Sequence, residues 1–288
     1  MSEVGSSGSR GKLPVSVIIP CYQCVLTLRV AVESIMNQTV KPREIILIED
    51  CSDDEGATLN LLHTIQLELE DLIRVVVITL PENRGAGEAR NAGWLKATQE
   101  FIAFLDADDA WHHEKLEIQI VWMLAHPDYV LTCHNSKRLF SRGHLPPLKK
   151  AFREKSLYWR ILLFKQEIAT RTVVLRRDVS QRFPRGVRHA EDYQLWLRVL
   201  SGGGKSKRLC LPLAYSYKAN FGAGGLSQDL SMMHKGVISC FGELLEDRVI
   251  SRVIYLLAVS FETLKYWRRL VVRLARRLYA GLLKGSAK

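Results

Sequence analysis

The most constraining feature of the sequence is the alternation of short apolar runs with helical patterns over the first 125 residues. Apolar runs rich in Val, Ile, Leu or Phe predict buried strands at 15–19, 44–48, 75–78 and 101–105. Amphipathic spacing predicts helices at 26–36, 59–72, 88–99 and 113–125. This order is typical of right-handed βαβ units. We therefore expect an α/β fold with a mostly parallel central sheet flanked by helices.

Beyond about residue 128 the pattern is less regular. Extended segments are expected at 129–133, 172–175 and 209–217, and a helix at 191–200. Loops are expected at 138–150, which is basic and contains proline, and at 221–227, which is rich in glycine. From residue 229 onward the pattern is largely helical. We expect a flexible tail at 1–12, one α/β domain at 13–228 and a C-terminal helical region at 229–288.

The positive charge of the chain is concentrated near its C-terminus. The formal net charge is +11, and from residue 265 onward the chain has cations and no acid. These cations are Lys265, Arg268, Arg269, Arg273, Arg276, Arg277, Lys284 and Lys288. The first 264 residues are therefore close to neutral, which argues against nucleic acid as a partner of the whole chain.

The same C-terminal segment is amphipathic. Leu264, Trp267, Val271, Leu274 and Leu278 fall on one face of a helix, and Lys265, Arg269, Arg273, Arg276 and Arg277 fall on the opposite face. This pattern predicts that the 264–284 helix lies on a membrane surface. The alternative is a helix that docks on the protein and leaves a charged face in water. The chain has no apolar run long enough to cross a membrane, and we expect no signal peptide. We expect reduced cysteines and a cytoplasmic protein, peripheral at the inner face of the membrane.

Three of the first four predicted strands end in distinctive residues. Pro20-Cys21-Tyr22 follows the first strand, Glu49-Asp50 the second and Asp106-Ala107-Asp108 the fourth. Ligands of such sheets bind beyond the carboxyl ends of the strands, so these residues are expected to converge on one edge. Cys21 and Cys24 have a redox-like spacing. A redox pair usually opens a helix, whereas this one ends a strand inside another motif, which disfavours that role.

Asp106 and Asp108 place two carboxylates one residue apart at this edge. Such close like charges disfavour joint ionisation unless a cation joins them, and Mg²⁺ uses one or two carboxylates together with substrate phosphates. The pair therefore predicts a divalent metal site. The alternative is a polar turn in which Asp109 caps the next helix.

Three further positions have both a functional and a structural interpretation. Asp50 could accept a hydrogen bond from a nucleotide base or ribose, or else Asp50 or Ser52 could cap the following helix. The segment 83–93 has glycines at 85, 87 and 93 and could approach phosphates, with Arg90 facing the site, or these glycines could serve tight turns. Asp192 opens a predicted helix, where an acid is usually a cap.

Five motifs in order resemble glycosyltransferase family 2. They are Val17-Ile18-Ile19-Pro20-Cys21-Tyr22-Gln23, Ile48-Glu49-Asp50-Cys51-Ser52, the segment 83–93, Phe104-Leu105-Asp106-Ala107-Asp108-Asp109, and Glu191-Asp192-Tyr193-Gln194-Leu195-Trp196-Leu197-Arg198. The resemblance extends from about residue 14 to residue 227. It implies the GT-A fold and a reaction that inverts the anomeric centre.

The resemblance also implies roles for individual residues. Pro20, Tyr22 and Asp50 would contact the base and ribose of the donor, and Arg90 is expected with them. Asp106 would lie near the ribose or the metal. Asp108 would ligate Mg²⁺ or Mn²⁺ bridging the donor diphosphate, and Asp192 would be the catalytic base.

Several positions depart from the family pattern. Gln23 stands where the family usually has Asn, Glu49 where it has the first of two Asp residues, and Cys51 where it has Gly. Tyr217-Lys218-Ala219-Asn220 replaces a segment that often contains a His. These departures leave the second half of the metal shell open.

The sequence thus predicts an inverting glycosyltransferase that moves a sugar from a nucleoside-diphosphate donor to a glycan or lipid-linked acceptor, as in cell-envelope polysaccharide synthesis. A UDP-sugar is favoured because Asp50 suits a uracil N–H. One alternative is a catalytically inactive scaffold that binds sugar nucleotides. Another is a nucleotidyltransferase, which would need a phosphate-binding glycine loop at positions 20–23, where this chain has Pro-Cys-Tyr-Gln.

Overall fold

The computed structural model describes residues 11–139, 148, 152–217 and 229–285, and the side chains of these residues up to position 275. The first ten residues of the expected tail, most of the 138–150 loop, the 221–227 loop and positions 218–220 lie outside this part. The chain forms two compact units. The first contains 1–157, 168–180 and 204–217, and the second contains 158–167, 181–203 and 218–288.

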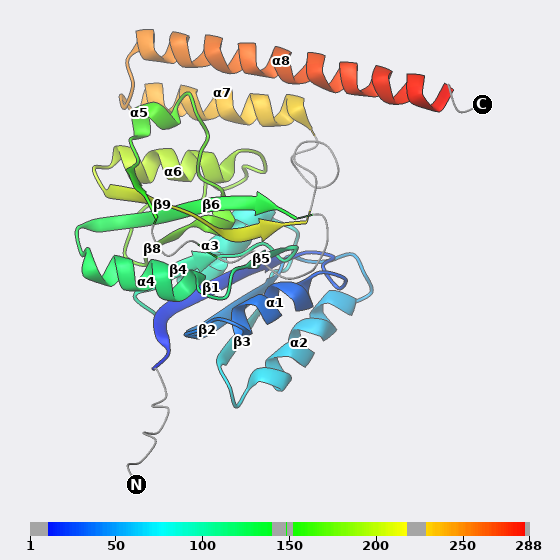
Figure 1. Cartoon of the computed structure of the whole chain (residues 1–288), viewed down its shortest axis with the longest axis vertical. Coiled ribbons are helices and arrows are strands. Elements are labelled where there is room, and N and C mark those ends of the chain that lie inside the picture. Colours follow the sequence, from blue (N-terminus) through cyan, green and yellow to red (C-terminus); the bar gives the residue numbers. More distant parts are fainter. Residues whose placement is uncertain (1–10, 140–147, 149–151, 218–228, 286–288) are drawn as a thin grey trace. The chain divides into compact units, whose positions relative to one another are not determined.

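The first unit is built on one mixed sheet (Figure 1). Its parallel half has the order β3-β2-β1-β4, formed by β3 (Arg74–Thr79), β2 (Pro42–Glu49), β1 (Leu13–Cys21) and β4 (Phe101–Phe104). The order continues through β8 (Val174–Arg176), β6 (Tyr129–Arg138), β9 (Lys205–Ser216) and β5 (Asp109–Trp111), and β7 (Glu154–Ser156) also pairs with β9. β8 is antiparallel to β4 and β6, and β5 is antiparallel to β9.

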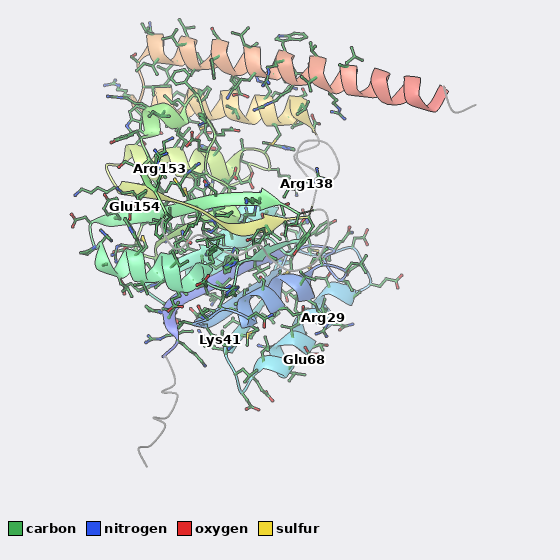
Figure 2. The ribbon with its side chains drawn as sticks, viewed as in Figure 1. Arg29, Lys41, Glu68, Arg138, Arg153 and Glu154 are labelled. Atoms are coloured by element: carbon green, nitrogen blue, oxygen red, sulfur yellow. The ribbon has the colours of Figure 1, made fainter. Side chains whose placement is uncertain are left out.

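Helices cover both faces of the parallel half. Alternate β1 residues, Val15, Val17 and Ile19, face the main apolar core together with residues of α1 (Leu28–Met36), α2 (Ala57–Leu69) and α4 (Lys115–Ala125). An exposed ion pair between Arg29 and Glu68, 2.8 Å long, joins α1 to α2 (Figure 2). The alternation of β1 residues between the two faces of the sheet is the period of two expected of a strand that is covered on both faces.

The opposite face of the sheet carries α3 (Ala86–Lys96), and Gly93 sets how closely it packs. A Cβ atom at Gly93 would lie 2.7 Å from Cγ2 of Ile18 and 2.8 Å from Cδ1 of Ile48. Such distances are too short for carbon atoms in contact, so the third glycine of the 83–93 segment serves helix–sheet packing.

The second unit is helical. It contains α5 (Trp159–Leu162), α6 (Glu191–Ser201), α7 (Leu230–Glu246) and α8 (Arg252–Gly285). The buried side of α6 includes Trp196, whose ring meets Phe183 edge-on. Arg198 on α6 pairs with Glu243 at 3.0 Å, and α8 lies alongside α7 (Figure 1). No helix in the described part of the chain is both long and apolar enough to cross a membrane.

The predicted α/β class and the first four βα units are confirmed. The three-residue strands β5 and β7 and the one-turn helix α5 were not predicted, because segments this short leave no readable periodicity. The strand expected at 172–175 begins at Val174, after a short 3₁₀ turn at Thr170–Thr172. The domain boundary placed at residue 228 stays a prediction.

Candidate active site at the carboxyl edge of the sheet

The carboxyl ends of β1, β2 and β4 meet at one edge. Cys21 is in register with Glu49, and the backbone N–H of Asp50 donates to the carbonyl of Cys21 at 2.9 Å. The N–H of Leu105 donates to the carbonyl of Ile18 at 3.1 Å, which brings the residues after β4 to the same edge. The structure therefore brings together the three strand ends that the sequence singled out.

Asp50 is buried and fixes the loop that leads into α3. Its Oδ1 accepts from the N–H of Arg84 and its Oδ2 from the N–H of Gly85, both at 2.8 Å. Its carbonyl accepts from the side chain of Asn83 at 2.9 Å. Gly85 has φ +86°, a conformation that favours glycine. Asp50 thus joins the end of β2 to the glycine-bearing loop.

The alternative in which Asp50 or Ser52 caps the following helix is wrong. The first turn of α2 bonds instead to Asp54, whose Oδ2 accepts from the N–H of Thr58 at 3.0 Å. The hydroxyl of Ser52 accepts from the N–H of Gln23 at 3.0 Å. This bond ties the end of β1 to the segment after β2.

Two departures from the family pattern occupy left-handed backbone. Gln23 has φ +46° and Cys51 has φ +53°. Asn and Gly, the residues usual at these two positions, are the ones that most readily adopt this conformation. Glu49 supports the turn, because its carboxylate accepts from the N–H groups of Cys51 at 3.0 Å and Ser52 at 2.6 Å. Residues other than the usual ones therefore adopt the left-handed backbone conformation at these two positions.

Arg90 reaches the acidic segment after β4. It lies in the first turns of α3, its side chain is buried, and its Nη2 lies 2.6 Å from Oδ1 of Asp106. Asp106 is partly exposed, as is Asp108 two residues later. The structure thus brings Arg90 and Asp106 together at the predicted donor edge.

Asp109 does not cap a helix, contrary to the alternative prediction. It begins β5, is buried, and its Oδ2 lies 3.1 Å from Nη1 of Arg171. Burial raises the pKa of Asp109 to about 7, the Arg171 guanidinium opposes this shift, and the charges of Asp106 and Asp108 add to it. The N–H of Asp109 also donates to the carbonyl of Asp106 at 3.1 Å, closing the turn that carries both acids.

Sequence reasoning missed Arg171. The only available signal was one cation in the otherwise uncharged stretch 168–175. Its Nε donates to the hydroxyl of Ser136 at 2.9 Å, so Arg171 connects Asp109 to β6.

Asp192 belongs to the second unit. It lies at the start of α6, is partly exposed, and its Oδ1 accepts from the N–H of Tyr193 at 2.7 Å. Ala190, two residues before it, has φ +61°. This geometry is that of an acid at a helix N-terminus.

The other predicted donor residues lie at the end of β1. Pro20 is partly buried, and the Tyr22 side chain is 46% exposed, which leaves the ring available for stacking. Cys21 and Cys24 are free thiols. Burial raises the pKa of Cys21, and a hydrogen bond from Cys21 lowers that of Cys24.

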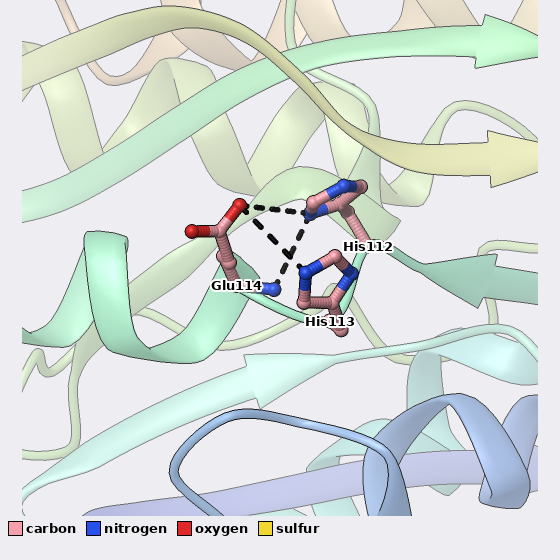
Figure 3. Close-up of side chains that lie close together, drawn as sticks. All are labelled: His112, His113 and Glu114. Carbon is pink, nitrogen blue, oxygen red and sulfur yellow. Dashed lines mark hydrogen bonds and ion pairs between the residues drawn. The ribbon is translucent and has the colours of Figure 1, made fainter. Parts of the chain in front are cut away.

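A second group of possible metal ligands, His112, His113 and Glu114, follows β5 in the chain (Figure 3). Oε2 of Glu114 lies 3.8 Å from Nδ1 of His112 and 3.9 Å from Nε2 of His113. Burial, with the charge of His113, lowers the pKa of His112, which favours its neutral form. Two imidazoles and a carboxylate suit Zn²⁺, whereas Mg²⁺ prefers oxygen, so this cluster differs chemically from the acidic edge.

Comparison with known proteins identifies the family of this chain. The family model described as Glycosyl transferase family 2 matches residues 16–182, and the chain belongs to that family. A relative in Escherichia coli, UDP-Glc:alpha-D-GlcNAc-diphosphoundecaprenol beta-1,3-glucosyltransferase WfgD, is 29% identical over 243 residues, covering 84% of this chain and 90% of the relative.

Solved structures show the same fold. Staphylococcus aureus TarS 1–349 in complex with UDP-GlcNAc matches with a TM-score of 0.65 at 19% identity, over 85% of this chain and 70% of that one. The mannosyltransferase PcManGT of Pyrobaculum calidifontis, in complex with GDP-Man and Mn²⁺, matches with a TM-score of 0.62 at 15% identity, over 94% and 82%. The predicted family and the GT-A fold are therefore confirmed.

Proposed function

We propose that the protein is an inverting glycosyltransferase that transfers a sugar from a UDP-sugar to a lipid-linked or glycan acceptor of the cell envelope. The observation that carries this proposal is the edge where β1, β2 and β4 end, because it gathers Asp50, Arg90, Asp106 and Asp108 in a chain of glycosyltransferase family 2. Glycosyl transfer itself is the activity of the family, whereas donor, metal and acceptor are parts of the proposal.

The proposed donor is a nucleoside diphosphate sugar with uracil as its base. Tyr22 would stack on the base, and Pro20 and Asp50 would line the pocket for the base and ribose. Arg90 would lie near the phosphates of the donor. Asp50 already accepts hydrogen bonds from two backbone N–H groups, which hold its carboxylate at the edge where the base would bind. The UDP-glucose named for the WfgD relative, and the UDP-GlcNAc bound to TarS, support this choice of base.

The acidic segment after β4 fits a hard divalent cation. Asp106 and Asp108 offer carboxylate oxygens at a partly exposed position, and their charges help to raise the pKa of Asp109. A cation placed there would relieve this repulsion. Asp108, with Asp106, would hold Mg²⁺ or Mn²⁺, and the ion would supply electrostatic stabilisation of the departing diphosphate. The Mn²⁺ in the PcManGT structure supports this assignment.

Asp192 is the proposed base. As the acceptor hydroxyl attacks C1 of the sugar, its proton passes to the Asp192 carboxylate, and the bond from C1 to the diphosphate oxygen breaks. Attack opposite to the leaving group inverts the anomeric centre. The bond from the Tyr193 N–H fixes one oxygen of the carboxylate.

The proposed acceptor is carried by a membrane lipid. The diphosphoundecaprenol acceptor named for the WfgD relative supports this class. The amphipathic 264–284 helix would keep the enzyme peripheral at the cytoplasmic face of the membrane.

The test is a panel of nucleotide sugars with Mg²⁺ or Mn²⁺ and a lipid-diphosphate acceptor, assayed with the unaltered chain and with Asp192→Asn. We expect UDP-sugar consumption, and a loss of kcat of about a hundredfold or more in Asp192→Asn with donor affinity retained. Asp229→Asn is the matched control, because Asp229 also starts a helix, and Asn caps a helix as well as Asp does. Unchanged turnover in Asp192→Asn would refute the assignment of the base.

A further inference from the structure

Helix α8 presents its apolar face to solvent. Between Val253 and Leu274 this face is about 32 Å long at 1.5 Å per residue. Its large side chains are exposed by 42–68%: Val253, Leu256, Leu257, Phe261, Leu264, Trp267, Val271 and Leu274. Contiguous exposed apolar surface of this extent marks a site of interaction with another molecule or a membrane.

Three charged residues of α8 turn away from this face, whereas Arg268 is exposed. The Glu262 side chain is only 1% exposed and forms ion pairs with Lys265 and with Arg269, the latter at 3.3 Å. Nζ of Lys265 also donates to the carbonyl of Phe164 at 3.3 Å, within the same unit. A helix that docks on a protein usually buries its apolar side, whereas α8 buries Glu262 and exposes large apolar side chains. The bond from Lys265 to Phe164 and the burial of Ala258 and Glu262 set which side of α8 faces the protein, so the apolar face lies in water unless another phase covers it.

The width of the face argues for a lipid surface over a second copy of the chain. A two-stranded coiled coil needs a narrow seam at alternate spacings of three and four, with charged residues beside it. Val253, Leu257, Leu264, Trp267, Val271 and Leu274 fall at such spacings. However, the flanking positions Leu256 and Phe261 are also apolar and exposed. Trp267 lies on the face as well, and its ring suits the boundary between head groups and acyl chains.

We propose that the face of α8 from Val253 to Leu274 inserts into the interfacial layer of a bilayer and holds the enzyme on the membrane that carries its acceptor. This inference rests on the proposed function for the lipid-linked acceptor and extends it, because it assigns attachment to apolar insertion. Apolar insertion does not require anionic lipid, so binding to neutral vesicles should persist at high salt, whereas the exposed Arg268 should add affinity for anionic lipid.

The experiment measures flotation of the full chain with phosphatidylcholine vesicles, with and without added anionic lipid, at low and high salt. We expect binding to neutral vesicles, and a loss of affinity of about tenfold or more in Leu264→Glu. The matched control is Leu67→Glu on α2, because Leu67 is 66% exposed and Leu264 is 68% exposed. If Leu264→Glu lowers the melting temperature, Val271→Glu on the same face repeats the test.

Equal vesicle affinity of the unaltered chain and Leu264→Glu would overturn the proposal. Binding only to anionic vesicles, abolished by salt, would also overturn it and assign attachment to the cations. A dimer in gel filtration that Leu264→Glu dissociates, without vesicle binding, would assign the face to a second copy. Failure of the proposed function would appear separately, as absence of sugar transfer by the unaltered chain in detergent solution.

Discussion

The carboxyl edge of the first unit and helix α8 of the second unit differ in the kind of side chain that they expose to solvent. At the edge, Asp106 is partly exposed, and the cations Arg90 and Arg171 hold the acidic segment from behind. On α8, the charged Glu262 is buried with its cations, and the large apolar side chains are in water. The edge therefore displays charge to a polar ligand, and the helix displays apolar surface to a lipid phase.

This difference also separates what sequence can predict from what it cannot. Parallel strands end at the same edge whatever their side chains, so the positions of Asp50 and Asp106 follow from chain order. A helical wheel separates two faces of α8 but does not say which one meets the protein. That choice depends on contacts between distant segments, such as the bond from Lys265 to the carbonyl of Phe164, which arises only in the folded chain.

The largest effect on stability is expected where the edge buries charge. Arg171→Met removes the cation beside buried Asp109 and should destabilise the fold by about 3 kcal/mol, because the Asp109 carboxyl group then lies next to two other acids without a compensating charge. Chemical denaturation monitored by circular dichroism measures this change. Arg29→Met is the control, since the Arg29–Glu68 pair lies in water on both sides, and its loss should be far smaller. Equal losses in the two variants would show that Asp109 does not depend on Arg171.

A smaller change in stability is expected when one glycine of each unit is replaced by alanine. Gly93→Ala places a Cβ atom within 2.8 Å of Ile18 and Ile48, and overpacking should destabilise by about 1–2 kcal/mol after the gain in helix propensity. Gly242→Ala on α7 meets nothing within 4 Å and should stabilise by up to about 1 kcal/mol. Thermal unfolding of the two variants should shift in opposite directions. A stabilising Gly93→Ala would contradict the close packing of α3 on the sheet.

The sequence thus predicted most of the first unit and the placement of most of its candidate residues. It identified Asp50 correctly as part of the edge, but not the backbone groups of Arg84 and Gly85 that its carboxylate binds. It gave no reason for Arg171, because the partner of that residue lies 62 positions away in the chain. The missed elements share this cause, since pairing of short strands such as β5 depends on distant segments.

The most direct test of the account is sugar transfer by Asp108→Asn as a function of Mg²⁺ or Mn²⁺ concentration. Asp53→Asn, an exposed acid in the same unit, is the control for loss of charge. We predict that Asp108→Asn lowers kcat by about a hundredfold or more and raises the metal concentration that gives half-maximal rate, whereas Asp53→Asn changes neither. Unchanged turnover and metal dependence in Asp108→Asn would contradict the assignment of the acidic edge as the active site.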